Sequence, residues 1–184
     1  MSGLFIAQES RPDGLLDLDV DALTPFQRAL LVIDGTVTQF IEAYTAERVD
    51  VTCLSQKRRV LTQPHTWLEV ESGASVIARD VLLKGAKTGE VYAYGTSLIA
   101  PERLEGPLLA GVEGAEESLG RLLRQNRAET YRELLWRGLE PADAPPCPGM
   151  QNKRQPHICR CYRMICRNHP LMVIVERFPL NLHV

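Results

Sequence analysis

Hydrophobic residues first recur at helical spacing just after residue 24. The apolar stripe consists of Phe26, Leu30, Leu31 and Ile33. Thr24 can act as the N-cap of this segment, Pro25 suits its first helical position, and Gln27 completes a capping box. These features predict a helix that begins at Pro25 and is interrupted at Asp34-Gly35.

A second helical pattern follows directly. Thr36 and Gln39 repeat the capping-box spacing, and the apolar face after them consists of Val37, Phe40, Ile41 and Tyr44. The pattern ends near Thr45. We therefore predict two short helices that meet at Asp34-Gly35-Thr36.

Strand patterns dominate the rest of the chain. Alternating or β-branched residues predict strands at 48–61, 75–83, 91–100, 158–167 and 171–178, and 67–70 reads as a further extension of the sheet. Glycine-rich residues 85–89 form a hairpin loop between the second and third of these strands. A turn around Asn168-His169-Pro170 joins the last two into a second hairpin.

The remaining segments complete the expected architecture. Residues 1–23 read as an extended lead-in, 101–114 as a loop, 118–124 and 128–137 as helices with Gly138 as a C-cap, and 139–156 as a Pro-rich loop. Strands grouped into hairpins, with helices elsewhere, favour an α+β fold. We expect one domain over 1–184, an antiparallel sheet flanked by helices.

Length and composition agree with a single globular domain. The chain has 184 residues, of which 45% are hydrophobic and 24% charged, and its net charge of −2 gives no reason to expect nucleic-acid binding. The stretch from Gln151 onward carries six basic residues against one acidic residue, so its net charge is +5 and that of the remainder −7. Groups that attract anions are therefore concentrated near the C-terminus.

Neither a membrane span nor a secretory leader is indicated. The longest apolar runs are far shorter than the ~20 residues that a membrane helix needs. The N-terminus lacks the basic region and long apolar stretch of a signal peptide. We expect a cytoplasmic protein, and a monomer in the first instance.

The five cysteines do not form a recognisable framework. They contain no C-x-x-C pair, so reduced thiols are expected. His157, Cys159, Cys161, Cys166 and His169 lie within one hairpin, but alternation turns Cys159 and Cys161 to one face and Cys166 to the other. No metal site is therefore predicted, and a zinc-dependent interaction module is left as a minor alternative.

Two ionisable residues fall on apolar faces of predicted strands. Arg79 shares a face with Ile77, Val81 and Leu83, and Glu176 shares one with Met172, Ile174 and Phe178. A buried charge needs an opposite charge, hydrogen bonds or a ligand. Arg79 suits a carboxylate ligand, and Glu176 suits acid or base chemistry. The alternative is an internal salt bridge, of the two with one another or with Asp80 or Arg163.

Helix starts provide a second kind of anion site. Thr36 and Leu119 lie where predicted helices begin, and unpaired backbone N–H groups at such positions favour an anion. Plain capping of the helices is the alternative interpretation.

With these residues in view, the chain resembles the chorismate pyruvate-lyase family. Several pieces carry the resemblance in order along the chain: 23–31 followed by Asp34-Gly35-Thr36-Val37-Thr38, Arg79 in a strand before Ala100-Pro101, Leu119-Gly120-Arg121, Tyr162-Arg163, and His169-Pro170-Leu171-Met172 through Glu176-Arg177-Phe178-Pro179. The resemblance implies an antiparallel sheet flanked by helices. It also implies removal of the enolpyruvyl group of chorismate to give 4-hydroxybenzoate and pyruvate, without metal or organic cofactor.

The resemblance further implies roles for individual residues. The ligand-binding arginine of the family falls at Arg79, and the carboxylate near the product hydroxyl falls at Glu176. Backbone groups that hold the ring carboxylate fall at Leu119-Gly120 and at Thr36 or Val37, and Arg163 is a basic position on the C-terminal hairpin. Arg79 and Glu176 are the implied catalytic pair. The implied substrate is the small molecule chorismate, and the product points to quinone biosynthesis, with ubiquinone, plastoquinone or a lipid left open.

A binding role is the alternative to catalysis. The fold is also similar to the effector-binding domain of a group of bacterial transcription regulators. Those regulators carry a DNA-binding domain, for which we expect no room in 184 residues. A sensor of this kind would have to act through a partner.

Overall fold

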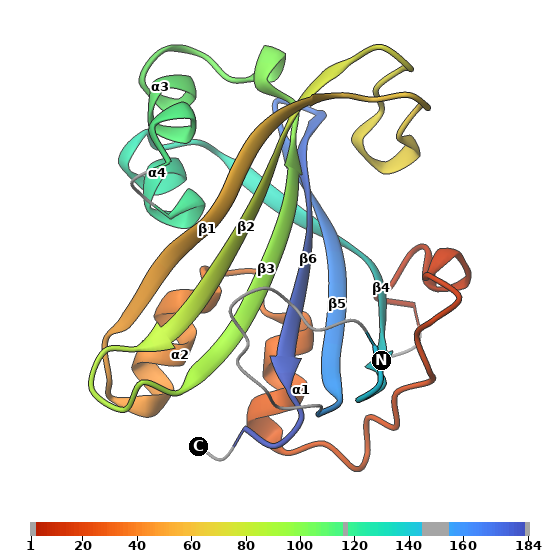
Figure 1. Ribbon diagram of the computed structural model, residues 1–184, viewed down its shortest axis with the longest axis vertical. Coiled ribbons are helices and arrows are strands. Elements are labelled where there is room, and N and C mark those ends of the chain that lie inside the picture. The colour runs from red at the N-terminus through yellow and green to blue at the C-terminus, as the bar shows by residue number, and fades with distance from the viewer. Residues whose placement is uncertain (1–2, 116–117, 145–154, 183–184) are drawn as a thin grey trace.

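The computed structural model describes residues 3–115, 118–144 and 155–182 (Figure 1). Six antiparallel strands form one sheet in the order β1-β2-β3-β6-β5-β4. They are β1 (Val49–Val60), β2 (Ser75–Gly85), β3 (Val91–Ile99), β4 (Thr130–Glu140), β5 (His157–Cys166) and β6 (His169–Pro179). The predicted α+β fold, an antiparallel sheet flanked by helices, is confirmed.

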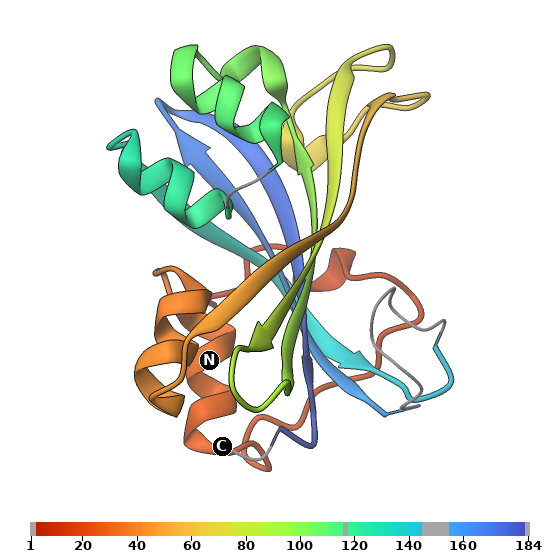
Figure 2. The same cartoon turned by 60° about the vertical axis from the view of Figure 1, so that its left-hand side comes forward.

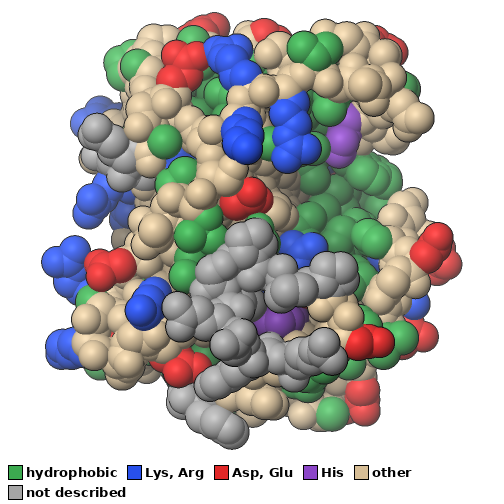
Figure 3. Space-filling model, in the orientation of Figure 1, with side chains coloured by type: hydrophobic (Ala, Val, Ile, Leu, Met, Phe, Trp, Pro, Cys, Tyr) green, Lys and Arg blue, Asp and Glu red, His purple; other side chains and the backbone are tan. Residues whose placement is uncertain are grey.

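The helices gather on one face of this sheet. They are α1 (Pro25–Val32), α2 (Val37–Thr45), α3 (Gly106–Gly114) and α4 (Leu119–Gln125), with short 3-10 turns η1 (Gln8–Ser10), η2 (Thr66–Leu68) and η3 (Pro101–Arg103). Figure 2 shows α1 with α2 over the lower half of the sheet and α3 with α4 over the upper half. Figure 3 views the opposite face, where basic side chains gather in the upper part. No helix among the described residues is long and apolar enough to cross a membrane.

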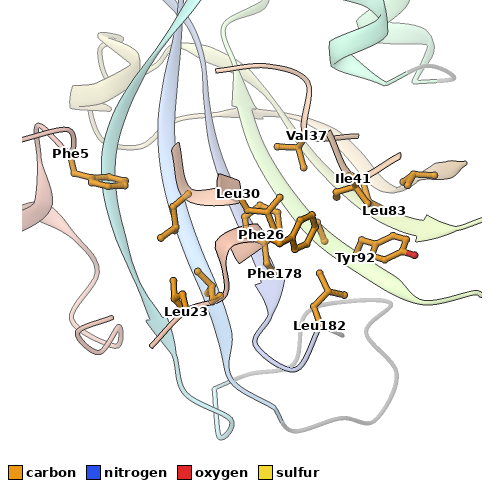
Figure 4. Close-up of a cluster of buried hydrophobic side chains, with 14 residues drawn as sticks. Phe5, Leu23, Phe26, Leu30, Val37, Ile41, Leu83, Tyr92, Phe178 and Leu182 are labelled. Carbon is orange, nitrogen blue, oxygen red and sulfur yellow. The ribbon is translucent and has the colours of Figure 1, made fainter. Parts of the chain in front are cut away.

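Helix α1 forms as its sequence predicts. Thr24 Oγ1 accepts a hydrogen bond from the Gln27 amide at 3.2 Å, and Gln27 Oε1 accepts one from the Thr24 amide at 2.9 Å. The apolar stripe then packs on the sheet: Phe26, Leu30, Ile41 and Phe178 are almost fully buried together (Figure 4). Burying a side chain of this size stabilises the fold by about 1.5–3 kcal/mol, so this cluster fixes α1 and α2 against the sheet.

The predicted helix at 128–137 is wrong, because this segment is strand β4. Its register with β5 shifts between Leu134 and Trp136, so Leu135 is an extra, bulged residue. The bulge breaks the alternation of a strand and lets Leu135 and Trp136 both be buried. Consecutive apolar residues then imitate a helix pattern. Gly138, predicted as a C-cap, lies inside β4, where the lead-in passes so close that a Cβ would meet Leu15 Cβ at 3.0 Å.

Three other segments differ from prediction. Residues 101–114, expected as a loop, contain η3 and helix α3, which forms because α4 packs closely on it: a Cβ on Gly111 would lie 2.4 Å from Leu122 Cδ2. Residues 67–70 do not continue the sheet, because η2 forms there and its Leu68 amide donates to His65 Nδ1. Of the predicted loop 139–156, residues 139 and 140 end β4, and 145–154 lie outside the described residues.

The lead-in protects an edge of the sheet. The amides of Ile6 and Ala7 donate to the carbonyls of Leu134 and Leu135 on β4, at 2.9 and 2.8 Å. Leu16 forms a further bridge with Leu139. An open strand edge is a template for unwanted pairing, and the lead-in therefore has a structural role beyond that of a linker.

Candidate functional site

The register of the sheet brings selected side chains together beneath the helices. Val81, Gly95, Glu176 and Arg160 oppose one another across β2, β3, β6 and β5. The next row on the same face contains Arg79, Ser97, Ile174 and Tyr162. Because these residues point toward the helices, they form the floor of the space between the sheet and the helices that cover it.

A cavity of about 100 Å³ lies on this floor. It is bounded by Val51, Val81, Leu83, Ala93, Gly95, Thr96, Ser97, Tyr162, Met164, Ile174 and Glu176 from the sheet, by Arg132 from β4, and by 36–38 and 118–120 from the helices. Among the described residues that line it, Arg132 and Glu176 carry the charges. The site is therefore mostly apolar, with a few polar groups that converge, as is typical of small-molecule sites.

The starts of α2 and α4 meet at the cavity. Thr36 precedes α2, but its side chain makes no capping hydrogen bond, so the predicted capping box with Gln39 is wrong. Thr36 instead packs against Gly120 of α4, where a Cβ would lie 2.8 Å from Thr36 Cγ2. Ser118 caps α4 by accepting a hydrogen bond from the Arg121 amide at 3.3 Å. Both helices therefore turn their positive ends toward the same space.

Glu176 is held by two neighbours from β5. Arg160 Nε donates to Glu176 Oε2 at 2.7 Å, and the Tyr162 hydroxyl donates to Oε1 at 3.1 Å. Burial, followed by the charge of Glu176, raises the pKa of Tyr162 above its ordinary value, which keeps the hydroxyl protonated as a donor. Neither salt-bridge partner predicted for Glu176 is the one observed.

Arg160 is the most completely buried cation of this group, with 0% exposure. Its Nη1 donates to the Ile33 carbonyl at 3.1 Å, and its guanidinium lies over the rings of Tyr162 and Phe178. Its Nη2 has no hydrogen-bond partner among the described residues. Arg160 therefore ties Glu176 to the end of α1 and fixes the carboxylate in place.

Arg132 reaches the cavity from β4. Its Nη1 donates to the backbone carbonyl of Asp34 at 3.0 Å and to the Asp34 carboxylate at 3.2 Å. Its guanidinium lies 5.6 Å from the ring centre of Tyr162. Its Nε is buried and donates to no described residue. A cation with a spare buried donor faces the same space as Glu176.

Five of the site residues expected from the sequence line this cavity: Thr36, Val37, Leu119, Gly120 and Glu176. Arg79 is buried, at 2% exposure, on the cavity face of β2, two residues from the lining residue Val81, but is not itself among the lining residues. Burial lowers its pKa from the ordinary value, although a guanidinium remains charged. The structure therefore places Arg79 beside the cavity rather than in its wall.

Arg163 lies on the opposite face of the sheet. Its Nε donates to Glu133 at 2.5 Å, its Nη1 donates to Glu69 at 2.7 Å, and its guanidinium lies over the Trp67 ring. Side chains alternate along β5, so Arg163 points away from the side that Tyr162 and Met164 share. It serves an ion-pair network there, and we do not include it in the site.

Sequence reasoning missed Arg132, Arg160 and Tyr162 as site residues. Arg160 carried the same signal as Glu176, a charge on the apolar face of a predicted strand, and the hairpin register pairs the two directly. Arg132 was hidden because its segment was taken for a helix. Correct assignment of β4 would have placed it on the face that holds Glu176.

The three cysteines of the C-terminal hairpin do not line this cavity. Cys159 and Cys161 are buried in the cluster on the far face of the sheet, and Cys166 packs on the helix side, so the predicted alternation is confirmed. Among the described residues, no three of the types His, Cys, Asp and Glu are grouped to hold a metal ion.

Comparison with known proteins gives two kinds of likeness. A family model described as "Chorismate pyruvate-lyase Rv2949c-like" matches residues 31–184. A chorismate pyruvate-lyase of Mycobacterium tuberculosis is 26% identical over 169 residues, which cover 89% of this chain and 84% of the relative. A chorismate pyruvate-lyase of Mycobacterium leprae is 26% identical over 156 residues, which cover 82% and 72%.

Solved structures share the fold at lower identity. The effector domain of PhnF from Mycobacterium smegmatis superposes with a TM-score of 0.62 at 14% identity, over 80% of this chain and 90% of that domain. The longer PhnF chain matches with a TM-score of 0.58 at 13% identity, over 80% of this chain and 65% of its own length.

Proposed function

This chain belongs to the Rv2949c-like chorismate pyruvate-lyase family, and we propose that it converts chorismate to 4-hydroxybenzoate and pyruvate. The single observation that carries the proposal is the setting of Glu176. Its carboxylate lines a small, mostly apolar cavity between two helix starts and is oriented by Arg160 and Tyr162. The curated relatives that match most of the chain carry the same name.

Chorismate is a dianion, so its binding requires donors and positive charge in a place with little water. We assign the ring carboxylate to the backbone amides at Thr36 or Val37 and at Leu119-Gly120, with Arg79 as the cation beside them. Two observations support this assignment: these helix starts line the cavity, and Arg79 lies on the same face of the sheet. Helix N-termini are suited to a carboxylate.

Glu176 is assigned to the other end of the ring. It accepts a hydrogen bond from the 4-hydroxyl and assists removal of the hydrogen at C4 while the C3–O bond breaks. The ring becomes aromatic, and the released enolpyruvate takes up a proton and becomes pyruvate. Aromatisation supplies much of the driving force, so alignment of the substrate contributes a large part of the rate.

No cofactor enters this proposal, because the elimination is redox-neutral: chorismate contains all the atoms of the two products. Arg160 and Tyr162 act through Glu176. They hold both of its oxygens in one orientation, which keeps the carboxylate directed at the ring instead of sampling several rotamers. Quinone biosynthesis is the use that we propose for the product.

The experiment is direct. Purified protein is incubated with chorismate and EDTA, and both products are followed by chromatography against a control without enzyme. Stoichiometric 4-hydroxybenzoate and pyruvate would support a metal-independent lyase. Folded protein that binds chorismate without forming products would refute the lyase and favour a binding role on the same fold.

A further inference from the structure

The proposed function leaves one charge of the substrate without a partner. Chorismate carries a second carboxylate on its enolpyruvyl group, next to the ether bond that breaks. An unpaired carboxylate in an apolar cavity costs several kcal/mol or is not bound at all. The cavity must therefore offer a second cation for this group, in addition to the one assigned to the ring carboxylate.

Arg132 meets this requirement. Its side chain is 12% exposed and lines the cavity, and Nε is buried with no hydrogen bond to a described residue. Arg160 is the other cation nearby, and its Nη2 is also without a described partner, but its Nε and Nη1 are held by Glu176 and the Ile33 carbonyl, and it does not line the cavity. A guanidinium with a spare donor in a low-dielectric wall binds a carboxylate strongly.

The order of residues across the sheet matches the order of groups in the substrate. Arg79 is on β2, Glu176 on β6 and Arg132 on β4, and these strands follow one another in that sequence across the sheet. In chorismate, the ring carboxylate comes first, then the 4-hydroxyl with the neighbouring ether, and then the enolpyruvyl carboxylate. A ring carboxylate on the Arg79 side therefore directs the enolpyruvyl group toward Arg132.

Contacts with Asp34 and Tyr162 fix the orientation of the Arg132 side chain. Asp34 holds Nη1 through both its backbone carbonyl and its carboxylate, and the guanidinium lies over the Tyr162 ring. Nη1 is therefore engaged by Asp34, whereas Nε has no hydrogen-bond partner among the described residues. The loop Asp34-Gly35-Thr36 thus joins the α2 start and Arg132 in one unit.

We propose that Arg132 binds the enolpyruvyl carboxylate. This contact makes the site favour chorismate, which carries the enolpyruvyl group, over a ring acid that lacks it. This rests on the proposed function, and it goes further by assigning the two carboxylates to different cations. At the transition state the departing enolpyruvate gains negative charge on its oxygen, and a neighbouring guanidinium stabilises that charge as well.

Substrate and product allow a sharp test, because 4-hydroxybenzoate retains the ring carboxylate and lacks the enolpyruvyl carboxylate. Arg132→Gln, Arg132→Lys, Arg79→Gln and the exposed control Arg59→Gln are compared. For each variant, kcat/KM for chorismate and the inhibition constant of 4-hydroxybenzoate are measured, and circular dichroism verifies folding. Arg59→Gln removes the same charge from β1 outside the cavity and serves as the electrostatic control.

Arg132→Gln is expected to lower kcat/KM about 100-fold and to leave the inhibition constant of 4-hydroxybenzoate near that of the unmodified protein. Arg132→Lys should recover part of the loss, because it restores the charge but not the planar fork. Arg79→Gln should weaken both ligands together. Equal weakening of both ligands by Arg132→Gln, or no effect on either, would overturn the assignment.

Failure of the lyase reaction would be visible separately. If the unmodified protein forms no products, the dissociation constants of chorismate and 4-hydroxybenzoate are measured by calorimetry on the same variants. A loss confined to chorismate in Arg132→Gln would then uphold the carboxylate assignment without the catalysis. If Arg132→Gln does not fold, Arg132→Lys is used for the comparison. The assignment of Arg132 would be contradicted if Arg132→Lys bound chorismate as tightly as the unmodified protein does but bound 4-hydroxybenzoate more weakly.

Discussion

Arg160 Nε donates to Glu176 Oε2 at 2.7 Å, directly across the register of β5 and β6. Glu176 is 13% exposed in its side chain and Arg160 is fully buried, so this ion pair lies between the cavity and the core. Its geometry means that the same contact that stabilises the sheet also sets the direction of the candidate catalytic carboxylate.

Glu176→Gln tests the role of this carboxylate in the reaction. The amide retains the size of the side chain but cannot accept a proton, so kcat should fall by about 100-fold or more if proton transfer contributes. Steady-state turnover of chorismate measures the change. Glu133→Gln is the matched control, because Glu133 pairs with Arg163 on the opposite face of the sheet. A loss of only a few-fold in Glu176→Gln would assign Glu176 to substrate alignment instead.

Arg160→Met should destabilise the protein strongly. Removing one member of a buried pair leaves the other uncompensated, which costs about 3–5 kcal/mol. Urea unfolding followed by circular dichroism gives the free energy of unfolding. Arg167→Met removes an exposed arginine paired with Glu105 and should change the free energy of unfolding far less, because solvent screens an exposed ion pair. Similar losses in the two variants would show that burial does not determine the energy of the Arg160 pair.

Gly120→Ala should obstruct the cavity between the two helix starts. The added Cβ would lie 2.8 Å from Thr36 Cγ2, and Thr36 is β-branched and has little rotamer freedom. We expect weaker binding of 4-hydroxybenzoate, measured by calorimetry. Gly114→Ala at the end of α3 meets no atom within 4 Å and should leave binding unchanged. Unaltered affinity in Gly120→Ala would show that ligand does not approach this wall.

Glu47 predicts a pH dependence of stability. Its carboxylate accepts hydrogen bonds from the amides of Thr88 and Lys87 and from the hydroxyls of Tyr92 and Thr88, at 2.5–2.9 Å. The Thr88 amide first, then the Tyr92 hydroxyl, lower the pKa of Glu47 from 4.5 to about 2.

Because the pKa is lowered in the folded state, the stabilisation is fully present above pH 4.5 and is lost as the pH falls from 4.5 toward 2. Glu47→Gln should therefore be less stable than the unmodified protein at neutral pH, and the difference should shrink across this window. Urea unfolding at pH 7 and at acidic pH measures it. A difference that does not change with pH would contradict the role of the charged carboxylate.

Cys161 should resist thiol reagents in the folded protein. Burial raises the pKa of its thiol to about 12, and the thiolate is the nucleophile. Alkylation of native protein, followed by mass spectrometry of peptides, should label the half-buried Cys53 and Cys166 before Cys161. Unfolding in urea should remove this order. Rapid labelling of Cys161 in the folded state would show that the sheet opens there.

Local chemistry explains the parts of the fold that the sequence predicts well. The capping box at Thr24 and Gln27, the glycine-rich loop after β2 and the turn between β5 and β6 depend on residues that are neighbours in the chain. Their structure therefore follows from short-range hydrogen bonds and backbone preferences. The apolar face around Glu176 was visible for the same reason, because alternation along one strand is a local property.

Non-local packing explains the errors. Strand β4 was taken for a helix because the bulge at Leu135 depends on the register with β5, which no local pattern contains. Thr36 does not cap α2 because Gly120, far along the chain, packs on its side chain. Helix α3 contains glycines that disfavour a helix, and contact with α4 stabilises it.

The amino-acid sequence by itself determined the fold class, the principal strands and first helices, the resemblance to the chorismate pyruvate-lyases and the choice of Glu176 as a candidate residue, since each follows from local periodicity or ordered motifs. Only the tertiary structure decided which charges meet. It paired Glu176 with Arg160, brought Arg132 to the cavity, left Arg79 beside it and turned Arg163 to the far face. Side-chain partners across a sheet depend on strand order, register and bulges, and these are set by the free energy of the whole packed chain.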